Sequence, residues 1–371
     1  MKKTLAALAV LGAFAGTSLA ADVTLYGVID TGLNWTQSKD AKTGDKKDTF
    51  EMKSGQNSGP RFGLKGTEQL GNGLVVGFNL ENSFNSDDGA LGQGGRLFGR
   101  EAIVYVRGGF GEVAFGRTGS LDAGTGSYNL IGTKATPMGL GWADTGKESY
   151  IFCEGARYDN TVTYKSPTFA GVTLYAQASL KEDTVTKATT ELEDGSVVTT
   201  TALKDAGDEG SSKANRYYAV GAMAKAGALN GGLVVSMQDY SRTTIGSNGD
   251  DGVAATAYVN YDFGMIKPMF AAQYFDQGDV AGAQKGYGVV AGFTAPVAGG
   301  KAYLTAGYRD AELVANSDVK VERVMVGAAY EYPLSKRTFV YTAVGYNQED
   351  RDDKAHKATI TQAMAGLVHK F

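Results

Sequence analysis

The chain ends in the nine residues Ala363-Met364-Ala365-Gly366-Leu367-Val368-His369-Lys370-Phe371, in which the side chains alternate in character and an aromatic residue comes last. An alternation with a period of two is the pattern of a β-strand that has two unlike faces. Similar alternation recurs along the chain: Val172, Leu174, Ala176 and Ala178 fall on one face, and the residues between them on the other. In each such segment one face suits lipid and the other suits water, which is typical of a membrane β-barrel.

The start of the chain has the features of a secretory signal peptide. Two lysines follow the first methionine, an apolar run covers residues 5–15, and the small residues Ser18 and Ala20 precede a potential cleavage point. We therefore expect residues 1–20 to be removed on export and residues 21–371 to form one β-barrel domain. An exported chain that ends in an alternating strand predicts a location in the outer membrane of a Gram-negative bacterium.

Composition excludes several classes of protein. Without the two lysines of residues 1–20, the chain has 34 basic and 40 acidic side chains, a formal net charge of −6. This acidity argues against a nucleic-acid partner, which favours a basic surface. No stretch after residue 20 contains the roughly 18 consecutive apolar residues of a transmembrane helix. The 6 prolines among 371 residues suit uninterrupted strand ladders, although a secreted β-sandwich or β-helix shares much of this composition.

Polar segments and tight turns divide the chain into strands. Seven tight turns rich in Gly, Asn and Pro alternate with eight longer polar segments, which predicts sixteen antiparallel strands. A barrel of this size is too wide for side chains to fill, so it encloses a water channel. The longer segments cover residues 36–59, 84–96, 118–156, 181–214, 241–250, 276–284, 311–317 and 349–358.

Several stretches resemble the general porins of Gram-negative bacteria, most closely the betaproteobacterial type. The similarity runs in order from residue 22 to residue 371. It is carried by Asp22–Asp30, Arg61–Gly71, Gly94–Arg100, Phe110–Arg117, Asp159–Pro167 and Leu334–Thr338.

This resemblance implies a homotrimer of sixteen-stranded barrels in which small hydrophilic solutes and ions diffuse through each protomer. It implies contact with outer-membrane lipid and lipopolysaccharide, and recognition by the outer-membrane assembly machinery through the terminal Phe371. Packing of Phe371 at the periplasmic interface is the simpler alternative. In similar proteins the third external loop folds inward and narrows the channel, and the segment at about 118–156 occupies that position in the sequence.

Three arginines are predicted to face the channel. Arg61 shares a strand face with Gly63 and Lys65, Arg100 with Ala102 and Val104, and Arg157 with Asp159 and Thr161. An arginine that faces lipid at mid-depth costs about 2–4 kcal/mol, so the lumen is the favoured side. Each also resembles a basic constriction residue of similar porins. The alternative is a hydrated arginine at headgroup level.

Arg117 is a fourth candidate, with a condition attached. Strict alternation groups it with Val113 and Phe115 on the presumed lipid face. Only a bulge at the end of its strand would turn it inward, and bulges are frequent at barrel rims.

Acidic side chains are expected opposite these bases. Glu81 has the parity of a lumen residue and resembles a constriction acid of the family, and Asp122 is a candidate in the loop, as are Asp144, Glu148 and Glu154. Similar porins often carry an aspartate where this chain has Asn129. The loss of that charge favours a net positive constriction and a weak preference for anions, because local charges dominate the field in a narrow throat.

Other functions have little support in the sequence. An enzyme needs a nucleophile and a base, but the two histidines, His356 and His369, have no convincing partner, and no metal cluster is visible. We expect neither a cofactor nor a metal, and Cys153 is a lone cysteine without an assigned role. A gated transporter with a plug domain has no room before the first strand. An adhesin or structural barrel is the alternative that the sequence leaves open.

Overall fold

The computed structural model describes residues 23–144, 146–181, 185–191, 197–203, 214–240, 250–278, 280, 282–353 and 357–371. The predicted signal peptide and much of the 181–214 segment lie outside these residues. Within the described part of the chain, no helix is long and apolar enough to cross a membrane.

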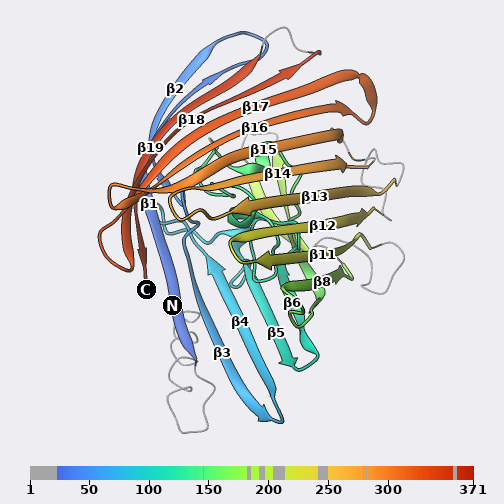
Figure 1. Ribbon diagram of the computed structural model, residues 1–371. Coiled ribbons are helices and arrows are strands. Elements are labelled where there is room, and N and C mark those ends of the chain that lie inside the picture. Colours follow the sequence, from blue (N-terminus) through green and yellow to red (C-terminus); the bar gives the residue numbers. More distant parts are fainter. Residues whose placement is uncertain are drawn as a thin grey trace.

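Antiparallel strands form one sheet that closes on itself (Figure 1). The last strand pairs with the first over twelve residue pairs, from Val28 opposite Lys370 to Lys39 opposite Thr359. The strands of this sheet are β1 Thr24–Lys39, β2 Lys46–Ser54, β3 Arg61–Gly71, β4 Leu74–Ser83, β5 Glu101–Gly108, β6 Gly111–Gly119, β7 Arg157–Lys165, β8 Val172–Ser179, β11 Arg216–Ala226, β12 Leu229–Asp239, β13 Gly252–Tyr261, β14 Lys267–Asp276, β15 Gln284–Val297, β16 Gly300–Leu313, β17 Asn316–Pro333, β18 Thr338–Arg351 and β19 Ala358–Lys370.

Outside this sheet, β9 (Val185–Glu191) and β10 (Val197–Leu203) form a separate hairpin. Three short 3-10 turns complete the described elements: η1 Gln93–Gly95, η2 Gly132–Lys134 and η3 Glu148–Tyr150.

Seventeen strands build a barrel of sixteen positions because β2 and β3 share one position. Both pair antiparallel with β1: β2 lies along residues 31–39 and β3 along residues 24–28. They are two halves of one strand, interrupted at residues 55–60, which we call the inward turn. The sixteen-stranded barrel is thus confirmed, but the predicted 36–59 loop is wrong. Most of that segment is strand, and only residues 40–45 connect β1 to β2.

Alternation along the strands sorts side chains between two environments. On β7, Val162 and Tyr164 are exposed on the outer surface, whereas Thr161 and Thr163 are buried inside the barrel. The outer face therefore carries the apolar residues that lipid accepts, and the inner face the polar ones.

Phe371 lies at the seam where the barrel closes. Its backbone N–H donates to the Gly27 carbonyl at 3.1 Å, and the Gly27 N–H donates to the Phe371 carbonyl at 3.0 Å. A Cβ built on Gly27 would lie 2.2 Å from Cζ of the Phe371 ring. Gly27 thus leaves the room that the terminal aromatic ring occupies.

Candidate functional site

The long segment between β6 and β7 lies inside the barrel, not outside it. Figure 1 shows it in the space that the strands enclose. Leu130, Ile131 and Phe152 of this segment are fully or almost fully buried, and they belong to a cluster with inward residues of β11 to β15 and β17. Met138 and Trp142 join a second cluster with inward residues of β1 and β17 to β19. The segment therefore covers a large part of the inner wall.

Barrel side chains also satisfy the irregular backbone of this segment. Gln273 Nε2 donates to the Cys153 carbonyl at 2.9 Å and its Oε1 accepts the Cys153 N–H at 2.6 Å. Arg309 Nε donates to the Ile151 carbonyl at 2.5 Å, and Asn260 Nδ2 to the Lys134 carbonyl at 2.9 Å. Buried backbone groups outside regular structure need such partners, so the inward position is built into the wall.

A cavity of about 610 Å³ is left between the segment, the inward turn and the opposite wall. Arg61, Arg100 and Arg157 line it, together with the carboxylates of Glu81 and Glu101. The structure thus brings together three of the four predicted bases and one of the two predicted acids. Apart from Leu140, the rest of the lining is polar or small: Gly55, Asn57, Ser58, Gly59, Asn79, Gly124, Thr125, Gly126, Ser127, Asn129, Thr133 and Gly141.

Glu81 holds two of these arginines. Its Oε1 accepts a hydrogen bond from Arg100 Nε at 2.5 Å, and its Oε2 lies 3.5 Å from Arg61 Nε. The hydroxyl of Tyr26 also donates to Glu81 at 3.0 Å. One carboxylate is therefore shared between two guanidinium groups.

Arg157 has no such partner. Its Nη2 donates to the Thr125 hydroxyl at 2.7 Å and its Nη1 to Gln93 Oε1 at 3.5 Å. Its Nε is buried without a hydrogen-bond partner, and Arg157 forms no ion pair with any residue that the structure describes. This guanidinium adds a positive charge to the cavity that no carboxylate in the described part of the chain contacts directly.

Arg100 reaches the cavity for a different reason from the one predicted. On β5 the buried residues are Glu101 and Ile103, whereas Val104 is exposed on the outer face. The face shared by Ala102 and Val104 therefore points outward, and the parity argument for Arg100 is wrong. Arg100 is directed inward because it precedes the strand, where its N–H donates to the Glu81 carbonyl at 3.2 Å.

Glu101 is a site residue that the sequence analysis missed. Its carboxylate accepts hydrogen bonds from the Thr118 hydroxyl at 2.5 Å, the Ser127 N–H at 3.0 Å and the Ser127 hydroxyl at 2.6 Å. Asn79 Nδ2 donates to it at 2.5 Å. The correct parity of β5 would have identified it.

Arg117 lies beside the cavity, not in its lining. The register of β6 on β7 shifts between Gly116 and Thr118, but the extra residue is on β7, where Asn160 has a φ of +53°. Along β6 the alternation continues, with Ala114 and Thr118 buried and Phe115 exposed, so the β6 bulge that would turn Arg117 inward is not found. Gly116 has a φ of +129°, which favours glycine. Arg117 Nη1 donates to Asp159 Oδ1 at 2.7 Å, and the same carboxylate pairs with Arg96 at 3.2 Å.

Asp122, predicted to face the bases, does not line this cavity. It is 3% exposed and accepts hydrogen bonds from the Tyr217 hydroxyl at 2.6 Å and the Ser236 hydroxyl at 2.5 Å. It anchors the segment to β11 and β12. Asp144 is engaged by Lys147 at 2.6 Å.

Glu148 and Glu154 form a buried pair of carboxyl groups behind the cavity. The Oε1 atom of each has no hydrogen-bond donor. Burial raises the pKa of Glu148 to about 7, and burial followed by repulsion from Glu148 raises the pKa of Glu154 well above its usual range. Glu148 Oε2 accepts the Thr136 hydroxyl at 2.5 Å, so only the two Oε1 atoms lack a donor, which fits a pair of carboxyl groups that shares a proton.

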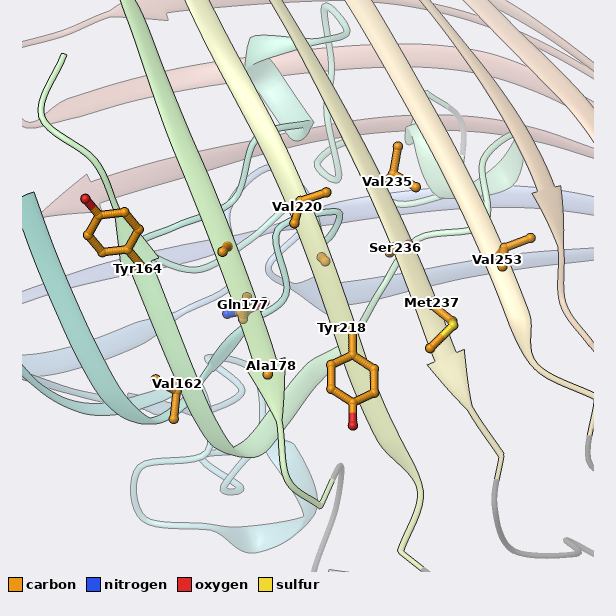
Figure 2. A pocket seen from close by; sticks show the side chains of 12 residues that line it. Val162, Tyr164, Gln177, Ala178, Tyr218, Val220, Val235, Ser236, Met237 and Val253 are labelled. Atoms are coloured by element: carbon orange, nitrogen blue, oxygen red, sulfur yellow. The ribbon is translucent and has the colours of Figure 1, made fainter. Parts of the chain in front are cut away.

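A hollow of about 650 Å³ on the outer surface is not part of this site (Figure 2). Val220, Val235 and Val253 stand on the outer face of their strands and are 42–59% exposed. The hollow belongs to the surface that faces the membrane.

Known proteins similar to this chain are outer-membrane porins. The family model described as Gram-negative porin matches residues 6–352. An outer membrane porin protein of Bordetella pertussis is 30% identical over 100% of both chains. Outer membrane porin protein 32 of Delftia acidovorans is 29% identical, covering 92% of this chain and 88% of the relative.

Solved structures show the same fold. The anion-selective porin from Comamonas acidovorans superimposes with a TM-score of 0.66 at 24% identity, over 95% of this chain and 100% of the other. OmpT of Vibrio cholerae in its trimer form gives a TM-score of 0.64 at 15% identity, over 95% and 100%.

The closed barrel, the polar cavity inside it and these similarities all indicate an outer-membrane porin. Members of the family are channels through which solutes diffuse passively, and their barrels lie in the outer membrane. The chain belongs to the Gram-negative porin family.

Proposed function

We propose that this porin prefers anions and that the cavity lined by Arg61, Arg100 and Arg157 is its constriction. Three guanidinium groups and two carboxylates, Glu81 and Glu101, line the cavity. The lining therefore has a net formal charge of +1, although the chain without residues 1–20 has a net charge of −6. Fixed charges at a constriction set the ion preference of a pore.

One observation carries this proposal: Arg157 has no carboxylate partner among the described residues, whereas Glu81 offsets part of the charge of Arg61 and Arg100. The structural similarity to an anion-selective porin points in the same direction. The solutes that fit are inorganic anions and small hydrophilic organic anions, with neutral solutes passing by size.

Three further elements belong to the proposed function. The working form is a homotrimer, in line with the trimer form of the structurally similar OmpT. Outer-membrane lipid and lipopolysaccharide contact the apolar outer face. Phe371, placed against Gly27 at the barrel seam, is recognised by the assembly machinery before the barrel closes.

Reversal potentials in a salt gradient test the anion preference. Arg157→Gln should lower the anion-to-cation permeability ratio by up to about fivefold, because a unit charge at about 4 Å in water is worth about 1 kcal/mol. Arg337→Gln, at an exposed arginine in a tight turn, is the matched control and should leave the ratio unchanged. A wild-type cation preference at moderate salt would contradict the proposal, and purified trimers that do not conduct would favour a structural barrel instead.

A further inference from the structure

The inward turn forms a second wall of the cavity, in contact with the long segment. Gly55, Asn57, Ser58 and Gly59 line the cavity directly. Gly55 has a φ of +68°, a conformation that favours glycine, and Pro60 ends the turn where β3 begins. The chain thus leaves the barrel wall for six residues and returns to the same strand position.

A single carboxylate fixes this turn. Asp30 of β1 is fully buried, and its Oδ2 accepts the N–H groups of Asn57 and Ser58, both at 2.7 Å. Its Oδ1 accepts the Tyr341 hydroxyl at 2.8 Å, and its backbone carbonyl accepts the Gly55 N–H at 3.0 Å. Adjacent N–H groups that converge on one oxygen need a strong acceptor at that point.

The inward turn also holds parts of the proposed constriction in place. The Gly59 carbonyl accepts Arg61 Nη1 at 3.0 Å. The Gln56 carbonyl accepts the N–H of Trp142 at 2.5 Å and that of Ala143 at 2.9 Å, which docks the long segment on the turn. Displacement of the turn would therefore move one arginine and one edge of the cavity together.

From these contacts we infer that Asp30 is a positioning residue for ion selectivity. It does not line the cavity. It holds the inward turn so that Arg61 and the long segment keep the opening narrow and positive. This inference rests on the proposed anion preference, which supplies the property that Asp30 would control.

Two substitutions at Asp30 separate anchoring from charge. Asp30→Ala removes the acceptor, whereas Asp30→Asn keeps one side-chain oxygen for the Asn57 and Ser58 N–H groups and presents an amide to the Tyr341 hydroxyl, which is able to accept it. Both remove the carboxylate. We expect Asp30→Ala to raise single-channel conductance and to lose most of the anion preference, and Asp30→Asn to stay close to the wild type. Loss of a negative charge alone would raise the anion preference in both variants.

A second variant covers the case in which Asp30→Ala does not assemble. Gln56 is 1% exposed and lies outside the cavity lining, and its Nε2 donates to the Leu33 carbonyl at 3.5 Å and to the Tyr341 hydroxyl at 3.4 Å. Gln56→Ala should shift both readouts in the same direction as Asp30→Ala, by a smaller amount.

The outcomes are distinguishable. Suppose that the wild type prefers anions, so that the proposed function stands. The positioning role of Asp30 is then wrong if the Ala variants retain the wild-type conductance and reversal potential. It is also wrong if Asp30→Asn behaves like Asp30→Ala. If the wild type has no anion preference, the proposed function itself fails. In that case an unchanged conductance in both Ala variants would also reject the role of the inward turn in keeping the opening narrow.

Discussion

At the scale of single residues, local backbone features decide which side chains reach the lumen. Arg100 points inward because it precedes its strand, and Arg117 pairs with Asp159 next to the β7 bulge at Asn160. Arg157 reaches the cavity at the start of β7, beyond a bulge at Asn160 that interrupts the alternation set by the buried Thr161 and Thr163. Residue parity is a sound guide within a regular strand and fails at its ends, where the period of two no longer applies.

The contact between Gly27 and Phe371 gives a prediction at this scale. Gly27→Ala places a methyl group where the Phe371 ring lies. The Arg61 carbonyl oxygen is 2.8 Å from the same point, so the methyl group has no free space to move into. We expect a loss of about 1–3 kcal/mol, typical of overpacking, measured as a lower temperature for loss of the folded band in heat-modifiability gels. Gly109→Ala has open space around the new Cβ and is the control. Equal stability of the two variants would contradict a close-packed seam.

At the scale of elements, the long segment between β6 and β7 is irregular yet firmly held. Its backbone is bonded by side chains of β13, β14 and β16, and its apolar residues enter two clusters on the inner wall. A segment bonded along its length in this way has a defined position, which a selective constriction requires.

The anchor at Asp122 is expected to contribute measurably to the stability of this element. Asp122→Ala leaves the Tyr217 and Ser236 hydroxyls without their acceptor in a buried site. An unsatisfied buried group costs about 1–3 kcal/mol, so thermal unfolding followed by circular dichroism should shift to lower temperature, and open-channel current noise should rise. Asp318→Ala, at an exposed position, should change neither. Wild-type values for Asp122→Ala would show that the anchor is dispensable.

The Glu148–Glu154 pair predicts a pH dependence of stability. Burial raises the pKa of Glu148 in the folded protein to about 7, from an ordinary value of 4.5. The folded state thus binds more protons than the unfolded state in this range, so this contribution to stability is full below about pH 4.5 and is lost as the pH rises through about 7.

Thermal unfolding midpoints between pH 5 and 8 measure this dependence. We expect the midpoint to fall with rising pH in the wild type and to change less in Glu154→Gln, whose amide donates a hydrogen bond without titrating. Glu68→Gln, at an exposed carboxylate, should retain the wild-type slope. An identical slope in all three proteins would show that the pair does not titrate in this range.

At the scale of the whole molecule, net charge and local charge have opposite signs. The chain without residues 1–20 has a formal charge of −6, whereas the lining of the cavity sums to +1. Solutes respond to the charges nearest to their path, because salt screens the more distant ones. The proposed anion preference is therefore a property of the constriction and not of the overall composition.

Salt concentration should reveal this local origin. The Debye length falls from about 10 Å at 0.1 M to about 3 Å at 1 M, so the anion-to-cation permeability ratio should decrease toward one at high salt. Reversal potentials across the same concentration ratio at low and high mean salt provide the measurement. A ratio that rises with salt would indicate that charges other than those of the constriction set the preference.

Much of the architecture follows from the sequence alone. Alternating side chains, Gly- and Pro-rich reversals and polar connections are local features, and they determined the closed barrel of sixteen strand positions and the lumen parity of Arg61 and Glu81. Each of these predictions needs only a strand period and the different demands of lipid and water.

Only the tertiary structure decided which segments and side chains occupy the interior of the barrel. The inward turn in the 36–59 segment, the anchoring role of Asp122 and the place of Glu101 all depend on contacts between residues far apart in the chain, such as Asp30 with Tyr341. Irregular segments have no side-chain period from which their position could be predicted. Their position is set by which distant side chains offer donors and acceptors to their backbone, and that is known only once the barrel has closed.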